Sequence, residues 1–472
     1  MYTADDATTW HLHADLAIVG SGGGGLVAAI AAARQGCRVS LHERTKEFGG
    51  GLARGPGILS AAGTRLQRSA GIQDSAEQFA DDIVAYDPRD PVLADRSRVV
   101  SLCHAMAALV DWLGETNVTQ LQFLARTLVR GHAAPRLHAH AGGTGAELGA
   151  DLVRAASRSS HVALRAASVV EDLWVDASGA VVGVAVREKR GPINIAAGRV
   201  LLACGGFGAN AELAAEHLRD LADFPYAGAP GSLGDGLRWG IGCGAATERL
   251  DACCITSLSV APGGFIVPDR LVRDGGIFVN QAGQRFIDEG SDALAVVRGM
   301  RVQPGRVAYL IFDERIYRMV READPYFARF VVPRAVRRGT DTADLARHFE
   351  IDAENLASTL EALRAHGSTG ADSFGRTIDT AALTAPFYGI RIAPVRTRTL
   401  GGLRVDASAH VLRADASPVK NLYACGGVVT DVSSSGGRNG CPFAHETITS
   451  LALGWMVGQS VRPGDESNPE PA

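Results

Sequence analysis

A run of glycines near the start of the chain has the spacing needed to hold a phosphate group. The sequence from Gly20 to Gly25 is GSGGGG, and an acidic residue, Glu43, follows. In such a run Gly20 permits a tight turn, Gly22 lets a pyrophosphate approach the backbone, and Gly25 lets a helix pack closely on a strand. A carboxylate about 20 residues further on accepts a hydrogen bond from a ribose hydroxyl. These residues predict dinucleotide binding.

The segments around the glycines are of the kind that would position them. Residues 16–19 are an apolar run typical of a buried strand, residues 26–35 are alanine-rich and helical in character, and residues 38–42 favour a second strand. The start of the helix would supply unpaired N–H groups and the positive end of a dipole to the phosphates. The alternative, a strand–helix turn without a ligand, leaves Glu43 and the glycine run unexplained.

Length and composition exclude several classes of protein. With 472 residues the chain exceeds one typical core, and its net charge of −4 gives no basic surface for nucleic acid. None of the eight cysteines forms a CxxC motif, so no metal site is predicted. The polar N-terminus shows no signal peptide and no apolar stretch is long enough to span a membrane, which predicts a cytoplasmic protein.

The pattern of elements predicts an α/β fold. Residues 75–130 favour helices, residues 162–186 favour three strands, and residues 200–203 form a further apolar strand. The character changes near residue 260, where short strands and loops begin, with a strand at 308–312 and a helix at 353–366. Strand-like segments return at 401–405 and 421–427, and a final helix is expected at 444–457. The order predicts a Rossmann-like domain that is interrupted by an inserted α+β domain.

Motifs along nearly the whole chain resemble those of one family, the succinate dehydrogenase/fumarate reductase flavoproteins, which include the ketosteroid dehydrogenases. The collinear matches are DLAIVGSGGGG, HERTKEFGGG, GGTGAELG, VLLACGGFGAN, GSLGDGLRWG, GGIFVNQAGQRFIDE, SFGR, APFYGI, TLGGLRVD and NLYACGG. The resemblance implies an FAD-binding domain formed by residues 1–262 and 392–462 and a substrate-binding or capping domain at 263–391. The Pro/Glu/Asp/Asn-rich composition of residues 463–472 predicts a disordered tail.

The resemblance also implies which residues bind FAD. Membrane-bound members of the family attach FAD covalently to a histidine, but Leu52 and Ala53 stand at that place here, so non-covalent FAD is expected. The start of the last helix would direct its positive dipole end at the flavin. The FAD-binding residues predicted from the motifs are Gly20, Gly22, Gly23, Gly24, Gly25, Glu43, Arg44, Gly50, Gly51, Gly143, Thr144, Gly145, Val170, Gly205, Asp235, Gly426, Gly427, Thr447 and Ile448.

This chain departs from the family at the residues that act on fumarate. The segment 285–292 has no arginine at the place of the family's proton donor, and residues 256–259 replace its early histidine. Arg398 stands where fumarate reductases have a second histidine, and Arg438 or Cys441 matches their carboxylate-binding arginine. Arg398 is our first candidate for binding a carboxylate or polarising a carbonyl, with a structural salt bridge as the alternative.

Four further residues are candidates for catalysis. Arg438 lies in a Gly/Ser-rich loop and would clamp a substrate anion. His445, at the start of the last helix, would act as an acid or base, unless it only satisfies the helix end. Arg273 aligns loosely with the family's proton relay, with a solvated loop charge as the alternative, which is the more common case. Tyr388 would be a phenol acid, with packing as the alternative.

The predicted function is an FAD-dependent oxidoreductase that forms or reduces a C=C bond beside a carbonyl or carboxylate, with ketone or ketosteroid dehydrogenation favoured. The alternatives are a fumarate or enoate reductase, another flavin oxidase, and a non-enzymatic flavin-binding protein. Only one complete dinucleotide motif is present, and FAD occupies it. The electron partner is therefore expected to be a quinone or a redox protein, and the substrate a small molecule.

Overall fold

The apolar run before the glycine turn forms the strand β2 (Leu12–Val19) near the middle of a nine-stranded sheet. The structure, a computed structural model, describes residues 1–87, 90, 95–129, 131–367, 370–377, 382–433, 445 and 447–464. The sheet order is β1-β8-β9-β10-β2-β3-β7, with β20 beside β10 and β19 beside β20. Its other strands are β1 (Tyr2–Thr3), β3 (Val39–His42), β7 (Val162–Arg165), β8 (Val169–Val175), β9 (Val181–Glu188), β10 (Gly191–Leu202), β19 (His410–Leu412) and β20 (Pro418–Ala424).

The strands that matter for the site are parallel. β10, β2, β3 and β7 pair in parallel, and β20 joins β10 through the register Val200↔Leu422 to Leu202↔Ala424. The carboxyl ends of parallel strands meet at one edge of a sheet, where ligands bind in open α/β folds. The chain after Val19, after His42, after Leu202 and after Ala424 therefore converges at this edge.

The helix α1 (Gly23–Arg34) follows the glycine turn and is buried along its length from Gly23 to Ala33. Its small side chains let it contact α5 (Gly145–Ser157) and α14 (Leu453–Ser460) closely. A Cβ atom on Gly24 would lie 2.4 Å from the backbone oxygen of Ser450, and one on Gly458 would lie 2.5 Å from that of Ala28. The C-terminal segment, η6 (Ile448–Ala452) followed by α14, is thus fixed beside the nucleotide-binding turn.

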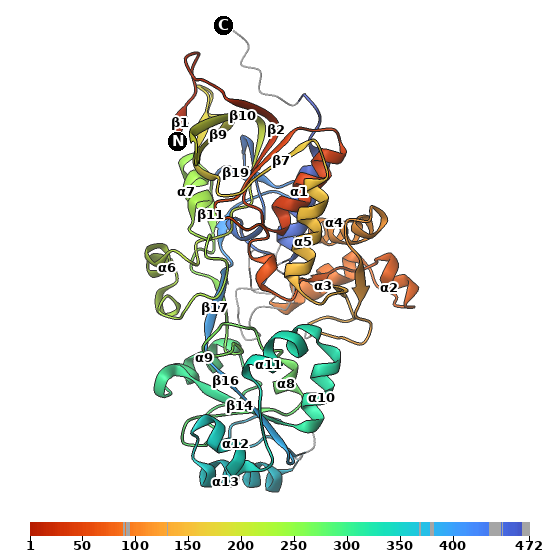
Figure 1. The fold of residues 1–472 in the computed structure, drawn as a ribbon, viewed down its shortest axis with the longest axis vertical. Coiled ribbons are helices and arrows are strands. Elements are labelled where there is room, and N and C mark those ends of the chain that lie inside the picture. The colour runs from red at the N-terminus through yellow and green to blue at the C-terminus, as the bar shows by residue number, and fades with distance from the viewer. Residues whose placement is uncertain are drawn as a thin grey trace.

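Smaller elements surround this sheet. A three-stranded sheet has the order β4-β6-β5 and lies with the helices α2, α3 and α4 on one side of the domain (Figure 1). The fully buried Arg136 binds Asp74 in the loop before α3 at 2.7 Å and Asp82 within α3 at 2.5 Å. The bounds are β4 (Ile58–Ser60), β5 (Leu121–Phe123), β6 (Leu137–His140), α2 (Arg65–Ser69), α3 (Ala76–Tyr86), α4 (Arg96–Glu115), α6 (Ala211–His217), α7 (Asp235–Gly242), β11 (Thr247–Glu248) and β18 (Gly402–Leu403).

A second part of the molecule lies below the first in Figure 1 and has its own core, which runs from Val260 to Ile392. Its sheet is antiparallel with the order β13-β14-β16-β15 and is flanked by helices. The bounds are β13 (Ile277–Val279), β14 (Ala308–Asp313), β15 (Arg337–Gly339), β16 (Phe387–Ile392), α8 (Arg270–Arg273), α9 (Ala293–Arg301), α10 (Glu314–Ala323), η4 (Phe327–Val331), α11 (Val332–Ala335), α12 (Thr342–Phe349) and α13 (Ala353–His366).

The antiparallel ribbon of β12 (Cys253–Thr256) and β17 (Val395–Thr399) connects the two parts. β17 runs along the long axis between them (Figure 1). The predicted fold class, an α/β FAD-binding domain with an inserted capping domain, is confirmed by this architecture. We call residues 263–391, the predicted insertion, the cap. The end points of the cap stay a prediction.

Individual elements differ from expectation mainly at their ends. The helix predicted at 353–366 is α13 with the same bounds, whereas the strand predicted at 401–405 is reduced to Gly402–Leu403. Most of the predicted tail, residues 465–472, lies outside the described residues. In the described part of the chain no helix is both long enough and apolar enough to cross a membrane.

Candidate active site

The glycine turn after β2 leaves room for a ligand at the start of α1. Gly20 has φ of +103°, and a Cβ atom there would lie 2.4 Å from the backbone oxygen of Ala203. Gly22 precedes α1, and the nearest atom to a Cβ on it would be 3.9 Å away. Within the described part of the chain, no side chain caps the first turn of α1. The backbone N–H groups therefore face open space, which fits a pyrophosphate.

Glu43 follows β3 and is 8% exposed. Its Oε2 atom accepts hydrogen bonds from the backbone N–H of Ser21 at 3.1 Å and from the Ser21 hydroxyl at 2.7 Å. Its Oε1 atom accepts from the N–H and the hydroxyl of Thr45, both at 2.9 Å. The carboxylate thus holds the glycine turn as well as lining the cavity described next. The adjacent Arg44 pairs with Asp235 at the start of α7.

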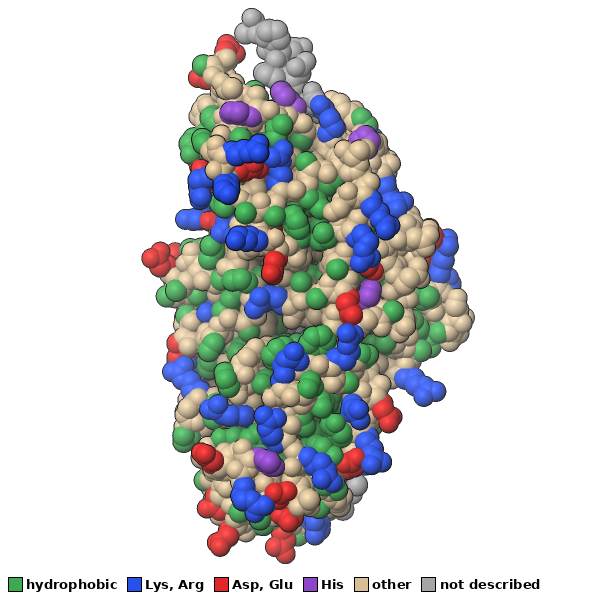
Figure 2. Space-filling model, in the orientation of Figure 1, with side chains coloured by type: hydrophobic (Ala, Val, Ile, Leu, Met, Phe, Trp, Pro, Cys, Tyr) green, Lys and Arg blue, Asp and Glu red, His purple; other side chains and the backbone are tan. Residues whose placement is uncertain are grey.

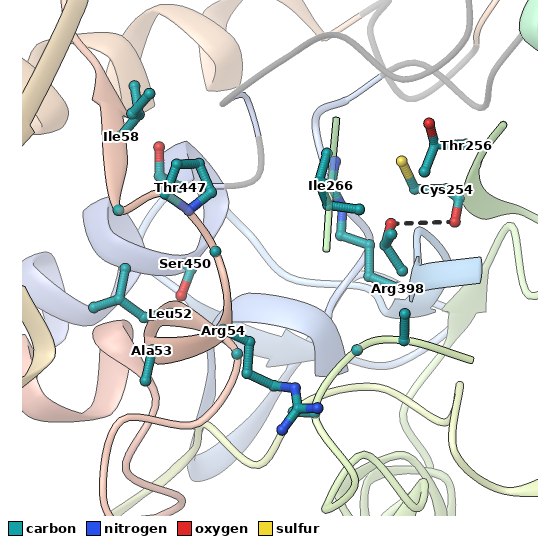
Figure 3. Close-up of a pocket in the computed structure, with 18 of the residues that line it drawn as sticks. Leu52, Ala53, Arg54, Ile58, Cys254, Thr256, Ile266, Arg398, Thr447 and Ser450 are labelled. Carbon is teal, nitrogen blue, oxygen red and sulfur yellow. Dashed lines mark hydrogen bonds between the residues drawn. The ribbon is translucent and has the colours of Figure 1, made fainter. Parts of the chain in front are cut away.

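One cavity of about 1480 Å³ extends from the glycine turn to the interface with the cap. Figure 2 shows hydrophobic side chains around a hollow near the middle of the face, with lysine or arginine side chains close to it. In Figure 3 Leu52, Thr447 and Ser450 lie on one side of this cavity, and Cys254, Thr256 and Arg398 lie opposite them. The cap contributes residues of α8, the start of α9 and the segment after α10.

Most of the predicted FAD-binding residues line this cavity. They are Gly20, Gly22, Gly23, Gly24, Glu43, Arg44, Gly50, Gly51, Gly143, Val170, Gly205, Gly426, Gly427 and Thr447. The predicted residues outside the lining are Gly25, Thr144, Gly145, Asp235 and Ile448.

The residues outside the lining have contacts that support the site from behind. Thr144 caps α5 by accepting from the N–H of Glu147 at 3.2 Å. Gly25 and Gly145 allow backbones to approach, since a Cβ on either would lie about 2 Å from a carbonyl oxygen, 2.2 Å and 1.9 Å respectively. Ile448 is fully buried in the core. The roles in FAD binding of both groups, the residues that line the cavity and those behind it, stay predictions.

Arg398 lies on β17 opposite Cys254 of β12 and borders the cavity. Its Nη2 atom donates to the Ser433 hydroxyl at 3.1 Å, and its Nε atom lies 3.6 Å from the Asp431 carboxylate. Asp431 is itself buried and accepts from the Ser433 N–H at 2.8 Å. The guanidinium is therefore held beside a buried carboxylate and is 20% exposed at the border of the cavity.

The other predicted catalytic residues lie in different places. Arg273 lines the cavity from α8 and pairs with Asp269 at 3.1 Å. Tyr388 is outside the lining: its hydroxyl donates to Glu314, and its ring stacks on Tyr317 at 4.3 Å. Arg438 and Cys441 lie outside the described residues. Their predicted roles in catalysis stay predictions.

His445 is fully buried and lies behind the cavity wall. Its Nε2 atom is 2.8 Å from Nε2 of His132, so one ring donates and the other accepts. Burial lowers the pKa of His445 well below its usual value, and burial also lowers that of His132 to about 4. The two rings form a neutral pair at pH 7. Any role of His445 as an acid or base stays a prediction.

Sequence reasoning did not select several polar residues that line the cavity. Asp431, Asp324 and Arg376 are examples, and each comes from a different segment of the chain. Burial raises the pKa of Asp324 above its usual range, and the nearby Asp269 acts in the same direction. Asp431 stands four residues after the NLYACGG strand motif, which was the available signal for it. Arg376 stands in the SFGR motif, to which no role was assigned, and Asp324 stands in no motif; the folding of the cap brings both to the cavity.

The chain is similar to known flavin-binding proteins over most of its length. The family described as "FAD binding domain" matches residues 15–441. An NADH:fumarate oxidoreductase of Klebsiella pneumoniae is 28% identical over 95% of this chain, which spans only 48% of that protein. A fumarate reductase (cytochrome) of Shewanella frigidimarina is 29% identical over 98% of this chain and 79% of its own. The open conformation of a flavocytochrome c3 fumarate reductase superimposes with a TM-score of 0.81 and 25% identity, covering 95% of this chain and 78% of that one.

The fold and the site together define an FAD-dependent oxidoreductase with a capping domain. The chain belongs to the FAD binding domain family, as the predicted resemblance to fumarate reductase flavoproteins indicated, and FAD is its cofactor. The residues present fit that group: the open turn at Gly22 would hold the pyrophosphate, and Glu43 would hold the ribose. When bound, FAD supplies a hydride acceptor or donor.

Proposed function

We propose that this protein forms or reduces a C=C bond beside a carbonyl or carboxylate group. The observation that carries the proposal is the Arg398 guanidinium on the cavity wall, 3.6 Å from Asp431 and bonded to Ser433. A guanidinium fixed at that point would bind the oxygen of the activating group and stabilise the negative charge that develops there. The reaction class agrees with the names of the relatives, which act on fumarate.

The pairing of two cations of the cavity wall, Arg398 and Arg273, favours a neutral ketone as the activating group. Arg398 lies next to the Asp431 carboxylate, and Arg273 is paired with Asp269 at 3.1 Å. Each of these cations is therefore offset by a carboxylate, so the pair offers little net charge to an anion. A polarised carbonyl needs only hydrogen bonds from the guanidinium fork. Oxidation of a cyclic or steroid-like ketone to the corresponding enone is the reaction that we favour.

A second candidate is reduction of an enoate such as fumarate. The names of the relatives favour it, since both proteins act on fumarate. The residues of the cavity wall do not favour it. Thr256 lies in the segment that matches the family's histidine, Ala293 follows the segment that matches its arginine, and both line the cavity. The same cavity would serve either direction of the reaction.

The electron partner and the mode of FAD attachment follow as further parts of the proposal. Leu52 and Ala53 line the cavity where covalent members have a histidine, and neither carries a nucleophile. FAD is therefore held without a covalent bond. A quinone or a redox protein accepts or supplies the electrons, as in relatives that are named after cytochrome.

Anaerobic flavin spectroscopy tests the proposal. The purified protein is mixed with cyclic ketones, steroid ketones and saturated acids, and bleaching of the oxidised flavin near its visible band is recorded. The photoreduced protein is then mixed with the matching enones and with fumarate. We expect bleaching by ketones and reoxidation by enones. Reoxidation by fumarate alone would overturn the ketone preference, and no response to any compound would overturn the proposed reaction class.

A further inference from the structure

A buried group of charges lies under the cap's side of the cavity. The carboxylate of Glu289 is fully buried and binds two guanidinium groups, Arg285 at 2.7 Å and Arg376 at 2.8 Å, each with a side chain that is 6% exposed. Its Oε1 atom also accepts from the N–H of Phe278 at 2.9 Å. Arg285 continues to Asp372 at 2.6 Å. The four side chains carry two positive and two negative charges, so the group is neutral as a whole.

Arg376 differs from Arg285 in what else it binds. Its Nη2 atom donates to the backbone oxygen of Val272 at 2.6 Å, and its Nη1 atom donates to that of Gly276 at 2.9 Å. Val272 lies in the last turn of α8, and Gly276 follows three residues after the helix ends. A cation at this end of a helix satisfies carbonyl groups that have no partner within the helix and is favoured by the dipole.

The helix that Arg376 holds is part of the cavity wall. Asp269, Arg270, Val272 and Arg273 all line the cavity, and α8 is only four residues long. So short a helix has little stability of its own, and its position depends on tertiary contacts. Arg376 supplies two such contacts from a loop that is distant in the sequence, and Glu289 fixes the guanidinium from the opposite side.

We propose that Arg376 is a positioning residue that sets the place of α8 and hence of Arg273 and Arg270 at the substrate end of the cavity. This inference rests on the proposed function, because it takes that end of the cavity to be where the substrate binds. Arg376 acts through the carbonyl groups of Val272 in α8 and of Gly276 just after it, whereas Arg285 pairs with Glu289 and Asp372. Substrate recognition therefore depends on a planar fork that bridges three acceptors, which a lysine cannot reproduce.

The two arginines provide a matched pair of variants. Arg376→Lys and Arg285→Lys both keep the positive charge, and both replace an arginine that is 6% exposed and paired with Glu289. Only Arg376→Lys loses a contact to α8. Amide hydrogen exchange of residues 271–276 is measured in FAD-loaded protein, which needs no substrate. We expect exchange about tenfold faster in Arg376→Lys, the effect of losing a charge-assisted hydrogen bond, and unchanged exchange in Arg285→Lys. Equal exchange in both variants would overturn the proposal.

Flavin reduction by the ketone found active in the spectroscopic panel gives the second readout. In Arg376→Lys we expect KM to rise roughly tenfold while kcat changes little, because a displaced binding group weakens substrate positioning. Faster exchange with an unchanged KM would overturn the link to the substrate. A raised KM with unchanged exchange would mean that Arg376 contacts the substrate directly, which also overturns the positioning role. Failure of the wild-type protein to react would overturn the proposed function and leave the exchange comparison valid.

Discussion

At the scale of residues, the Glu43 carboxylate holds the glycine turn that is predicted to bind the nucleotide. It accepts four hydrogen bonds from Ser21 and Thr45, at 2.7 to 3.1 Å. A carboxylate that orders the glycine turn prepares the backbone N–H groups for the phosphates before the nucleotide arrives. Binding of the ribose would then add to an arrangement that is already in place.

Glu43→Ala should weaken FAD binding by at least about tenfold, because hydrogen bonds to a charged group are worth roughly 1.5–3 kcal/mol. The dissociation constant of FAD is measured by fluorescence titration of the apoprotein. Glu171→Ala serves as the control, since Glu171 lies on β8 with a side chain that is 38% exposed. Unchanged FAD affinity in Glu43→Ala would contradict the assignment.

Arg398→Ala should leave FAD bound and lower the rate of flavin reduction by about 100-fold or more, the loss seen when one charge-stabilising donor is removed from an active site. The measurement is stopped-flow bleaching with the substrate identified in the panel. Arg404→Ala is the control, because Arg404 follows β17 in the chain and pairs with Glu248 on the surface at 3.4 Å. Wild-type rates in Arg398→Ala would remove this residue from the site.

At the scale of elements, the contact between α1 and the C-terminal segment closes the nucleotide site. Gly24 lies where the backbone of η6 approaches, and the same segment contributes Thr447, Ser450 and Leu451 to the cavity. Residues that are more than 400 positions apart in the chain therefore form one wall. A change in the packing of either element should affect the cofactor as well as the fold.

Gly24→Ala tests this contact. The added Cβ would lie 2.4 Å from the Ser450 backbone oxygen and 2.8 Å from Sγ of Cys425, so one element must shift. We expect a loss of about 1–3 kcal/mol in the free energy of unfolding, together with weaker FAD retention on a desalting column. Gly114→Ala in α4 is the control, because nothing lies within 4 Å of its added Cβ. Equal effects of the two substitutions would be inconsistent with close packing at Gly24.

At the scale of the whole molecule, buried histidines link stability to pH. Burial lowers the pKa values of His42, His132 and His138 to about 4 in the folded protein, from 6.5 when unfolded. Between these two values the unfolded chain binds more protons than the folded one. The contribution to stability is therefore complete above pH 6.5 and is lost as the pH falls towards 4.

We expect the urea midpoint of unfolding, measured with excess FAD, to be lower at pH 5.0 than at pH 7.5. His138→Gln should reduce this difference, because His138 is bonded to Thr64 and to the backbone of Arg136 in its neutral form. The same midpoint at both pH values would show that these histidines do not carry the pH dependence.

The cap illustrates how far the sequence alone reaches. The motif GGIFVNQAGQRFIDE indicated a family segment, and its Glu289 turns out to be buried between Arg285 and Arg376. The SFGR motif that contains Arg376 lies 87 residues later, and no local pattern joins the two. Likewise Asp431 could not be paired with Arg398, since the distance of 3.6 Å between them exists only after β17 and the loop beyond β20 have packed.

The sequence by itself determined the nucleotide-binding unit and the family, because the glycine turn, its helix and Glu43 are neighbours whose spacing expresses a local backbone requirement. Tertiary structure decided which side chains line the cavity. The Tyr388 hydroxyl bonds to Glu314 and the His445 ring bonds to His132, and both side chains lie outside the cavity lining. Arg398 and Arg273 line the cavity. Side-chain direction at the interface between two domains depends on how the domains pack, and no short pattern in one chain segment records that packing.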